Sequence, residues 1–151
     1  AIAGAVIGEC DFLDDALEGA VVGGGIGAIA GAMEGGAVDR AQQKQMDELI
    51  RAFGEENLRG YIELVQCNHK KAIAYFKVGQ VSDIEDHKLT GFWMEAIAEK
   101  DNRNAEKTQE MLEELVELDP DIDDDMMART AVDQYVLELR SDRRSNQISC
   151  N

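Results

Sequence analysis

Glycine recurs at every fourth residue from Gly19 to Gly35, and this ladder constrains the fold more than any other feature of the sequence. Its rungs are Gly19, Gly23, Gly27, Gly31 and Gly35, and a second ladder beside it consists of Ala16, Ala20, Gly24, Ala28, Ala32 and Gly36. Residues four apart lie on one face of a helix, so the two ladders form a strip almost free of side chains. Each glycine costs a lone helix about 0.8–1.0 kcal/mol relative to alanine. The segment therefore predicts a helix pressed against another helix backbone, as small-xxx-small spacing permits.

This spacing, over residues 16–36, resembles the glycine-zipper segments of membrane-associated and envelope proteins. The resemblance implies close helix packing and membrane association, and it implies no reaction. The apolar run Gly19–Met33 would be about 22 Å long as a helix, whereas a hydrocarbon core is about 30 Å thick. Extending the run to Val38 reaches the required length but includes Glu34. We therefore expect a marginal span in isolation and a workable span within an oligomer.

Composition favours helices and excludes nucleic acid as a partner. The chain contains one proline and few aromatic residues, and its net charge is −16. Phosphate contacts require clustered Lys and Arg, so this charge argues against nucleic-acid binding. It also argues against electrostatic attraction to an anionic membrane, so any membrane contact would be hydrophobic. We expect an all-α protein.

Apolar residues at helical spacing predict a series of helices after the ladder. Their expected ranges are Ala41–Phe53, Glu55–Cys67, Lys70–Val81, Ser82–Lys100 with a capping box at its start, Ala105–Leu118 and Asp123–Arg140. The first of them could continue the zipper helix without a break. The chain thus divides into a packing or membrane segment (1–38), a domain of antiparallel helical hairpins (39–140) and a frayed polar tail (141–151).

The hairpins resemble tetratricopeptide-like repeats, because the segment LVELDPDI at 115–122 fits the close of such a repeat. One repeat length upstream, apolar or small residues fall near the expected core positions, namely Leu58, Tyr61, Ile62, Val65 and Ala74. The second unit departs from the pattern, since Glu95 stands where an apolar residue belongs and Thr108 replaces a small alanine. An unrelated helical bundle remains the alternative.

Cysteines and histidines do not form a complete metal site. Cys10, Cys67 and Cys150 lack metal spacing, and free thiols are slightly preferred, although Cys67 and Cys150 could form a disulfide in an oxidising compartment. Cys67 and His69 are two residues apart and would face different sides of a helix. We expect His69 and His87 to be solvent-facing or capping, and we expect no bound metal and no cofactor.

Acidic residues are expected to act as caps and solvated surfaces. Asp119, Asp121 and Asp123 fit the first positions of a calcium loop, but Asp124 and Thr130 occupy the glycine and glutamate positions. An acidic cap for the last helix is the preferred interpretation. A further group of carboxylates is interpreted as solvated helix faces, namely Glu95, Glu99, Glu110, Glu113, Glu114 and Glu117.

These patterns predict a non-enzymatic assembly protein, either a homo-oligomer or a subunit of a larger complex. The zipper would pack or anchor the chain at a membrane, in a location such as the bacterial envelope, and the acidic helical domain would bind a protein partner. One alternative is an oligomeric pore, in which the acids select cations. Another is a soluble structural subunit, in which the zipper is buried in protein alone.

Overall fold

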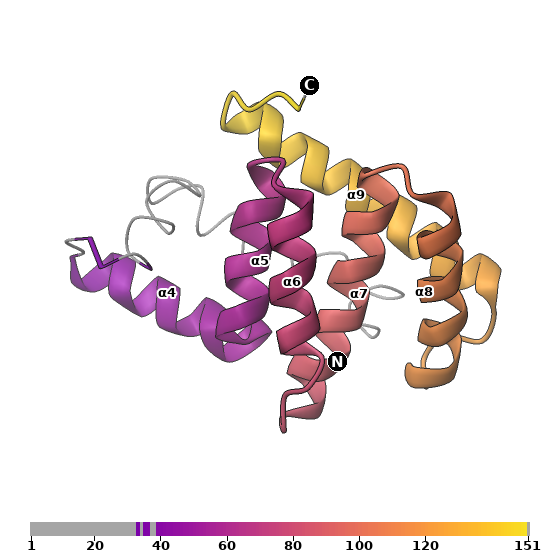
Figure 1. Ribbon diagram of the computed structural model, residues 1–151. Coiled ribbons are helices and arrows are strands. Elements are labelled where there is room, and N and C mark those ends of the chain that lie inside the picture. The colour runs from indigo at the N-terminus through magenta and orange to yellow at the C-terminus, as the bar shows by residue number, and fades with distance from the viewer. Residues whose placement is uncertain (1–32, 34, 37–38, 151) are drawn as a thin grey trace.

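A computed structural model describes residues 33, 35–36 and 39–150, and this part of the chain folds into helices without any strand (Figure 1). The helices are α4 (Arg40–Phe53), α5 (Glu55–Val65), α6 (His69–Gly79), α7 (Glu85–Asp101), α8 (Ala105–Leu118) and α9 (Asp125–Ser145). The all-α prediction is confirmed for these residues. Most predicted boundaries agree within a few residues, because the apolar stripes and the breaks between them are well marked.

Consecutive helices pair as hairpins. α5 packs on α6, α6 on α7, and α7 on α8, while α4 contacts α5 and α7. α9 runs diagonally across this row and contacts α5, α7 and α8 (Figure 1). The core between them is formed by the predicted apolar stripes and includes Leu58, Phe76, Trp93, Leu112 and Val132. None of the helices in the described ranges is both long enough and apolar enough to cross a membrane.

The start of α4 corrects the expectation that it continues the zipper helix without a break. Asp39 Oδ1 accepts a hydrogen bond from the Gln42 amide (2.8 Å), and the Gln42 side chain accepts one from the Asp39 amide (3.2 Å). This reciprocal capping box begins a new helix. Before it, Gly35 has a φ of +90°, which is incompatible with a right-handed helix. The end of α4 at Gly54 agrees with the prediction.

The start of α7 also differs from the prediction. The sequence placed a capping box at Ser82, but the N-cap residue is Ile84, which makes no side-chain cap bond. Ser82 lies in the turn after α6, where its amide donates to the Gly79 carbonyl and its Oγ accepts from the Ile84 amide. Ser82 therefore stabilises the turn between α6 and α7 and does not cap α7.

Glycines bring α5, α6 and α7 into close contact. A Cβ atom at Gly60 would lie 2.4 Å from the Phe76 ring. A Cβ atom at Gly91 would lie 2.9 Å from both the Phe76 carbonyl oxygen and the Gln80 amide nitrogen. Because these last two atoms belong to the backbone, they cannot move aside as a side chain could. The absence of a side chain at Gly91 sets the spacing of α6 and α7.

We expect Gly91→Ala to lower the free energy of unfolding by about 1–3 kcal/mol, because the methyl group would force α6 and α7 apart. Helix propensity alone would change stability in the opposite direction, by about 1 kcal/mol. Urea unfolding followed by the fluorescence of Trp93 measures the difference. A variant more stable than the wild type would contradict the close contact.

Candidate functional site

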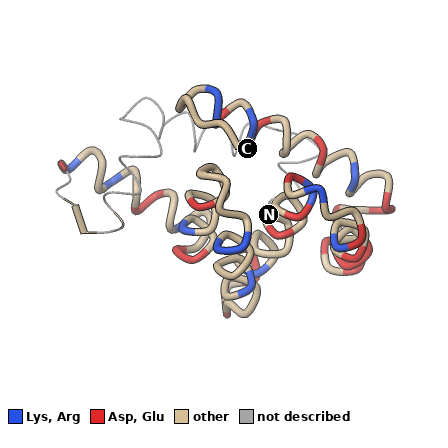
Figure 2. The backbone as a smooth tube through the Cα atoms, turned by 45° about the horizontal axis from the view of Figure 1, so that its top comes forward, with Lys and Arg blue, Asp and Glu red and all other residues tan. Residues whose placement is uncertain are grey.

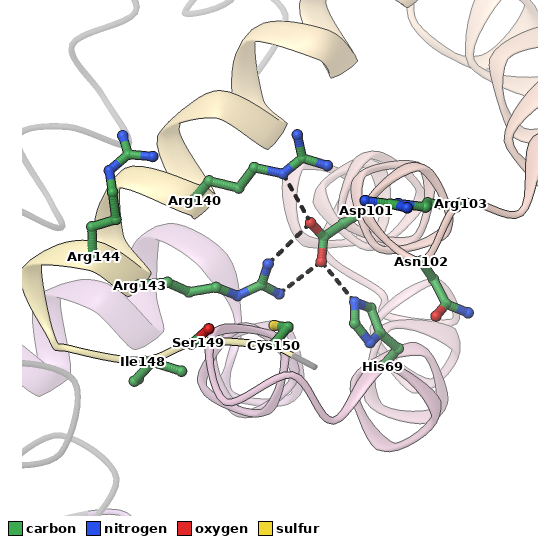
Figure 3. Close-up of a pocket in the computed structure, with 10 residues that line it drawn as sticks. All are labelled: His69, Asp101, Asn102, Arg103, Arg140, Arg143, Arg144, Ile148, Ser149 and Cys150. Carbon is green, nitrogen blue, oxygen red and sulfur yellow. Dashed lines mark hydrogen bonds and ion pairs between the residues drawn. The ribbon is translucent and has the colours of Figure 1, made fainter.

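Three helices end around one pocket (Figure 3). α5 ends at Val65, α7 at Asp101 and α9 at Ser145. The residues that line the pocket come from these ends and from the segments that follow them, namely His69, Asp101, Asn102, Arg103, Arg140, Arg143, Arg144, Ile148, Ser149 and Cys150. The pocket thus brings together parts of the chain that are up to about eighty residues apart in sequence.

Two residues beyond the end of each of these three helices stands a left-handed residue that is not glycine. Cys67 has a φ of 69°, Arg103 of 60° and Gln147 of 58°. After each, an amide donates to a carbonyl five residues earlier, as in Asn68 to Glu63, Asn104 to Glu99 and Ile148 to Arg143. Glycine is usual at this position of a helix end, because the left-handed conformation costs other residues about 1–2 kcal/mol. Two of these positions bear a side chain that lies at or beside the pocket, namely Cys67, through its sulfur atom, and Arg103, through its guanidinium.

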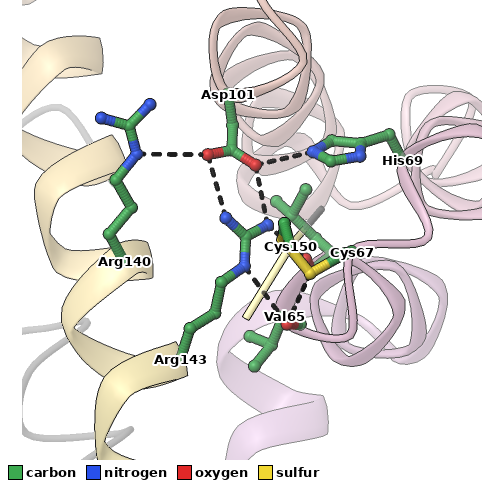
Figure 4. Close-up of polar contacts among 8 residues, drawn as sticks. Val65, Cys67, His69, Asp101, Arg140, Arg143 and Cys150 are labelled. Carbon is green, nitrogen blue, oxygen red and sulfur yellow. Dashed lines mark hydrogen bonds and ion pairs between the residues drawn. A yellow bond between two sulfur atoms is a disulfide. The ribbon is translucent and has the colours of Figure 1, made fainter. Parts of the chain in front are cut away.

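Arg143 is the buried centre of the site (Figure 4). Its guanidinium donates to both carboxylate oxygens of Asp101, at 3.0 and 2.7 Å. It also donates to the carbonyl oxygens of Leu64 (2.6 Å) and Val65 (3.2 Å). Those carbonyls belong to the last turn of α5, where helical hydrogen-bond partners run out and the helix dipole favours a cation. One side chain therefore closes the end of α5 and binds the end of α7.

Asp101 is held as a carboxylate by its partners. Besides Arg143, His69 Nε2 lies 2.6 Å from one carboxylate oxygen and Arg140 Nε lies 3.5 Å from the other. Burial by itself would raise the pKa of Asp101, but the hydrogen bonds and charges of Arg143 and His69 outweigh burial and hold the pKa below its usual value. Asp101 lies one residue beyond the predicted end of its helix at Lys100, and its side chain is only 3% exposed.

Two further contacts fix the end of α9 to α5. Cys67 and Cys150 form a disulfide, with their Cα atoms 5.6 Å apart, so the preference for three free thiols was wrong. The Tyr61 hydroxyl donates to Asp142, and burial together with the Asp142 charge raises the pKa of Tyr61. The expected frayed tail from residue 141 was also wrong, since α9 continues to Ser145 and Cys150 is covalently bound.

A second cluster of acids was also misjudged from the sequence. Glu95 and Glu99 are 6% and 7% exposed, although both were expected to be solvated. Gln80 donates to Glu95 (2.7 Å), and Lys77 lies 3.8 Å from it. Burial raises the pKa of Glu99, and the nearby charge of Glu95 raises it further, against a hydrogen bond from Asn104. The helices on either side of α7 cover these carboxylates more than the hydropathy pattern indicated.

The remaining candidate residues have structural roles. His87 Nε2 donates to the carbonyl of Arg51 near the end of α4 (2.8 Å), which agrees with the capping prediction. Asp119 accepts from the Trp93 indole (2.9 Å), and Asp124 caps α9. The acidic cap is thus confirmed. In the part of the chain that the structure describes, no three His, Cys, Asp or Glu side chains are placed to hold a metal ion.

Most of the glycine ladder lies outside the described residues, namely Gly19, Ala20, Gly23, Gly24, Gly27, Ala28 and Gly31, and so does Cys10. Of the glycines in the two ladders, the structure describes only the last of each, Gly35 and Gly36, and Gly35 lies in a turn. Helix packing through the ladder therefore stays a prediction.

Sequence reasoning missed the arginines of this site. Arg143 follows Val132, Val136 and Leu139 at helical spacing, so it extends the buried stripe of α9. That continuation was the available signal, and the polar character of the segment concealed it.

Comparison of the chain with models of protein families, with curated proteins and with solved structures finds no match.

We expect Asp101→Asn to destabilise the protein by about 3–5 kcal/mol at neutral pH, because it leaves the buried Arg143 charge without its anion. The lowered pKa means that the folded state binds this proton more weakly than the unfolded chain does. The stability gained from Asp101 is therefore present above the unfolded value of 3.8 and is lost as the pH falls through the lower folded pKa.

Thermal unfolding across pH compares this variant with Asp133→Asn as a matched control. Asp133 lies in an exposed ion pair with Lys100 (3.7 Å), and its loss should change stability by less than about 1 kcal/mol. Equal effects of the two variants at neutral pH would contradict the structural role of Asp101.

We expect Glu99→Gln to stabilise the protein at pH 7. The raised pKa means that the folded state binds the Glu99 proton more tightly, so stability falls as the pH rises through the unfolded value of 4.5. An exposed pair of like charges costs a helix about 0.2–0.5 kcal/mol, and the increase in the free energy of unfolding should be larger than this. The increase should vanish near pH 4. Glu114→Gln, at an exposed position of α8, is the control. A melting temperature lower than that of the control at pH 7 would refute this account.

Proposed function

We propose that this chain is a non-enzymatic assembly protein. In this proposal the glycine ladder of residues 16–36 packs against another helix, in or beside a membrane, and makes a homo-oligomer or anchors the chain in a larger complex. The helical domain of residues 39–150 presents its surface to a protein partner. What carries this proposal in the described part of the chain is a group of exposed apolar side chains on an acidic protein.

Three of the six large apolar side chains that are exposed in the described residues gather at the turn between α6 and α7. Val78 is 52%, Val81 79% and Ile84 55% exposed. Isolated exposed apolar residues are ordinary, but a group of them rimmed by charge is typical of a protein contact. The N-terminal turn of α7, directly after Ile84, supplies that charge through Glu85 and Asp86.

An apolar hollow lies next to this turn. It has a volume of about 280 Å³ and lies between the start of α7 and the end of α8. Leu89, Phe92, Leu118 and Pro120 line it, and Glu85, Asp86 and Lys88 surround it. A partner with an apolar side chain and a basic neighbour would complement this surface, and the many acids of α8 extend the negative field beside it (Figure 2).

The Cys67–Cys150 disulfide supports a location outside the reducing cytosol, such as a bacterial envelope. Closing a loop of this length restricts the unfolded chain and contributes about 4–5 kcal/mol in the chain-entropy model. Two alternatives remain distinct from the proposal. A pore would conduct ions across a bilayer, and a soluble structural subunit would be extracted without detergent.

The test uses the full chain with Gly27→Leu, in the middle of the ladder. A leucine there should force the packed helices apart and reduce the oligomer in mild detergent. Because leucine is a better helix former and is more lipophilic, the variant should keep its helicity and its retention in membranes after an alkaline wash.

Ile26→Leu, on the neighbouring face, is the matched control and should leave the oligomer unchanged. Light scattering coupled to gel filtration measures the particle size, and circular dichroism measures the helicity. A Gly27→Leu protein with the native oligomer would show that the ladder is not a packing surface.

A further inference from the structure

A cavity of about 550 Å³ opens beside the Arg143–Asp101 pair, and arginines line it from two directions (Figure 3). Arg103 comes from the turn between α7 and α8, whereas Arg140 and Arg144 come from the last turns of α9. The volume falls within the range of about 300–1,000 Å³ that is usual for small-molecule sites. The cavity is thus large enough for an organic ligand.

The cavity is positively charged although the protein carries a net charge of −16. Four arginines and one carboxylate line it, which leaves a charge of +3 even with His69 neutral. Both oxygens of that carboxylate, Asp101, are bound by Arg143. Figure 2 shows the basic residues near the C-terminal end of α9.

The outer arginines have donors to spare. Within the described ranges, Arg103 and Arg144 form no ion pair, and Arg140 makes only its 3.5 Å contact through Nε. Among the acids in the part of the chain that the structure describes, Asp101 is the only one that lines this cavity. Like charges held together repel, and the left-handed backbone at Arg103 adds strain. A bound anion would offset both costs.

We propose that this cavity binds a small molecule that bears a phosphate group and at least two negative charges. Arginine forks donate in pairs to phosphate oxygens, and a tetrahedral phosphate accepts from donors that approach from several directions. A planar carboxylate would satisfy at most two such forks. Arg103 follows α7 whereas the other arginines belong to α9, so the donors come from two parts of the chain, which suits the tetrahedral group (Figure 3).

The opposite wall accommodates the rest of the ligand. Ile148 and the Cys67–Cys150 disulfide supply an apolar surface, and Ser149 supplies a hydroxyl. The disulfide also holds residues 146–150 against the cavity, so this wall has a fixed position. The site is independent of the proposed assembly function, because none of its residues belongs to the glycine ladder or to the α6–α7 turn.

Isothermal titration of the full chain in mild detergent tests the site with pyrophosphate, inorganic phosphate and succinate. We expect saturable binding of pyrophosphate at one site, weaker binding of phosphate, and succinate weakest of the three. Rising salt should weaken binding, because the contacts are between charges. Absence of saturable binding of both phosphate compounds, or tighter binding of succinate, would overturn the proposal.

Variants locate the binding in this cavity. Arg144→Gln and Arg103→Gly should each weaken pyrophosphate binding about tenfold, as expected for the loss of one charge-assisted hydrogen bond. Glycine is well suited to the left-handed position of Arg103, so that variant should melt no lower than the wild type. Arg51→Gln, on the exposed part of α4, changes the net charge equally and should leave binding unchanged. Equal losses in all three variants would indicate a diffuse charge effect and refute the site.

The phosphate group could belong to a soluble compound or to a lipid headgroup. Flotation with phosphatidylcholine vesicles, with and without phosphatidic acid, separates the two sources. Binding to phosphatidic acid that Arg144→Gln weakens would support the site with a lipid ligand, and binding of free pyrophosphate alone would support it with a soluble one. The proposed site would be refuted if neither arginine substitution changed vesicle binding and the free phosphate compounds did not bind.

Discussion

The guanidinium of Arg143 holds the ends of three helices at one point. Its side chain is only 7% exposed, and it bridges the last carbonyls of α5 and the carboxylate at the end of α7 from its own place on α9. A buried cation is costly unless all its surroundings are arranged to accept hydrogen bonds. Arg143 is therefore stable only if α9 lies where this side chain reaches α5 and α7 at the same time. Apolar packing alone would allow more positions of α9.

The same ion pair determines the character of the neighbouring cavity. Asp101 uses both of its oxygens on Arg143, with His69 as a third partner, so it neutralises little of the charge on Arg103 and Arg144. The left-handed residues after the helices contribute to the same site. At these positions glycine would be less strained, but Cys67 and Arg103 place side chains at or beside the cavity. Structural stability and an unneutralised surface thus arise from the same few residues.

The fold could be predicted from the sequence to a large extent, because helical spacing marks the buried faces directly. The site could not. Arg143 continues the stripe of Val136 and Leu139, but a charged residue in a polar segment reads as solvent-exposed unless its partners are known. The pairing of Cys67 with Cys150 depends on a distance that no spacing gives. Glu95 and Glu99 were predicted to be solvated because the spacing within one helix does not show that neighbouring helices bury them. The glycine-zipper and tetratricopeptide-like resemblances stay predictions.

The contacts that join α5 to the end of α9 span most of the domain in sequence. Cys67 and Cys150 are 83 residues apart, and Arg143 is 78 residues from Val65. Hairpins between neighbouring helices close short loops and form early, whereas contacts across such a separation form late. During synthesis the helices from α5 to α8 can therefore pair before α9 has emerged. At that stage Asp101 can contact His69 of α6 but still lacks Arg143, so the contacts that join the ends of the three helices are completed only when α9 has been synthesised.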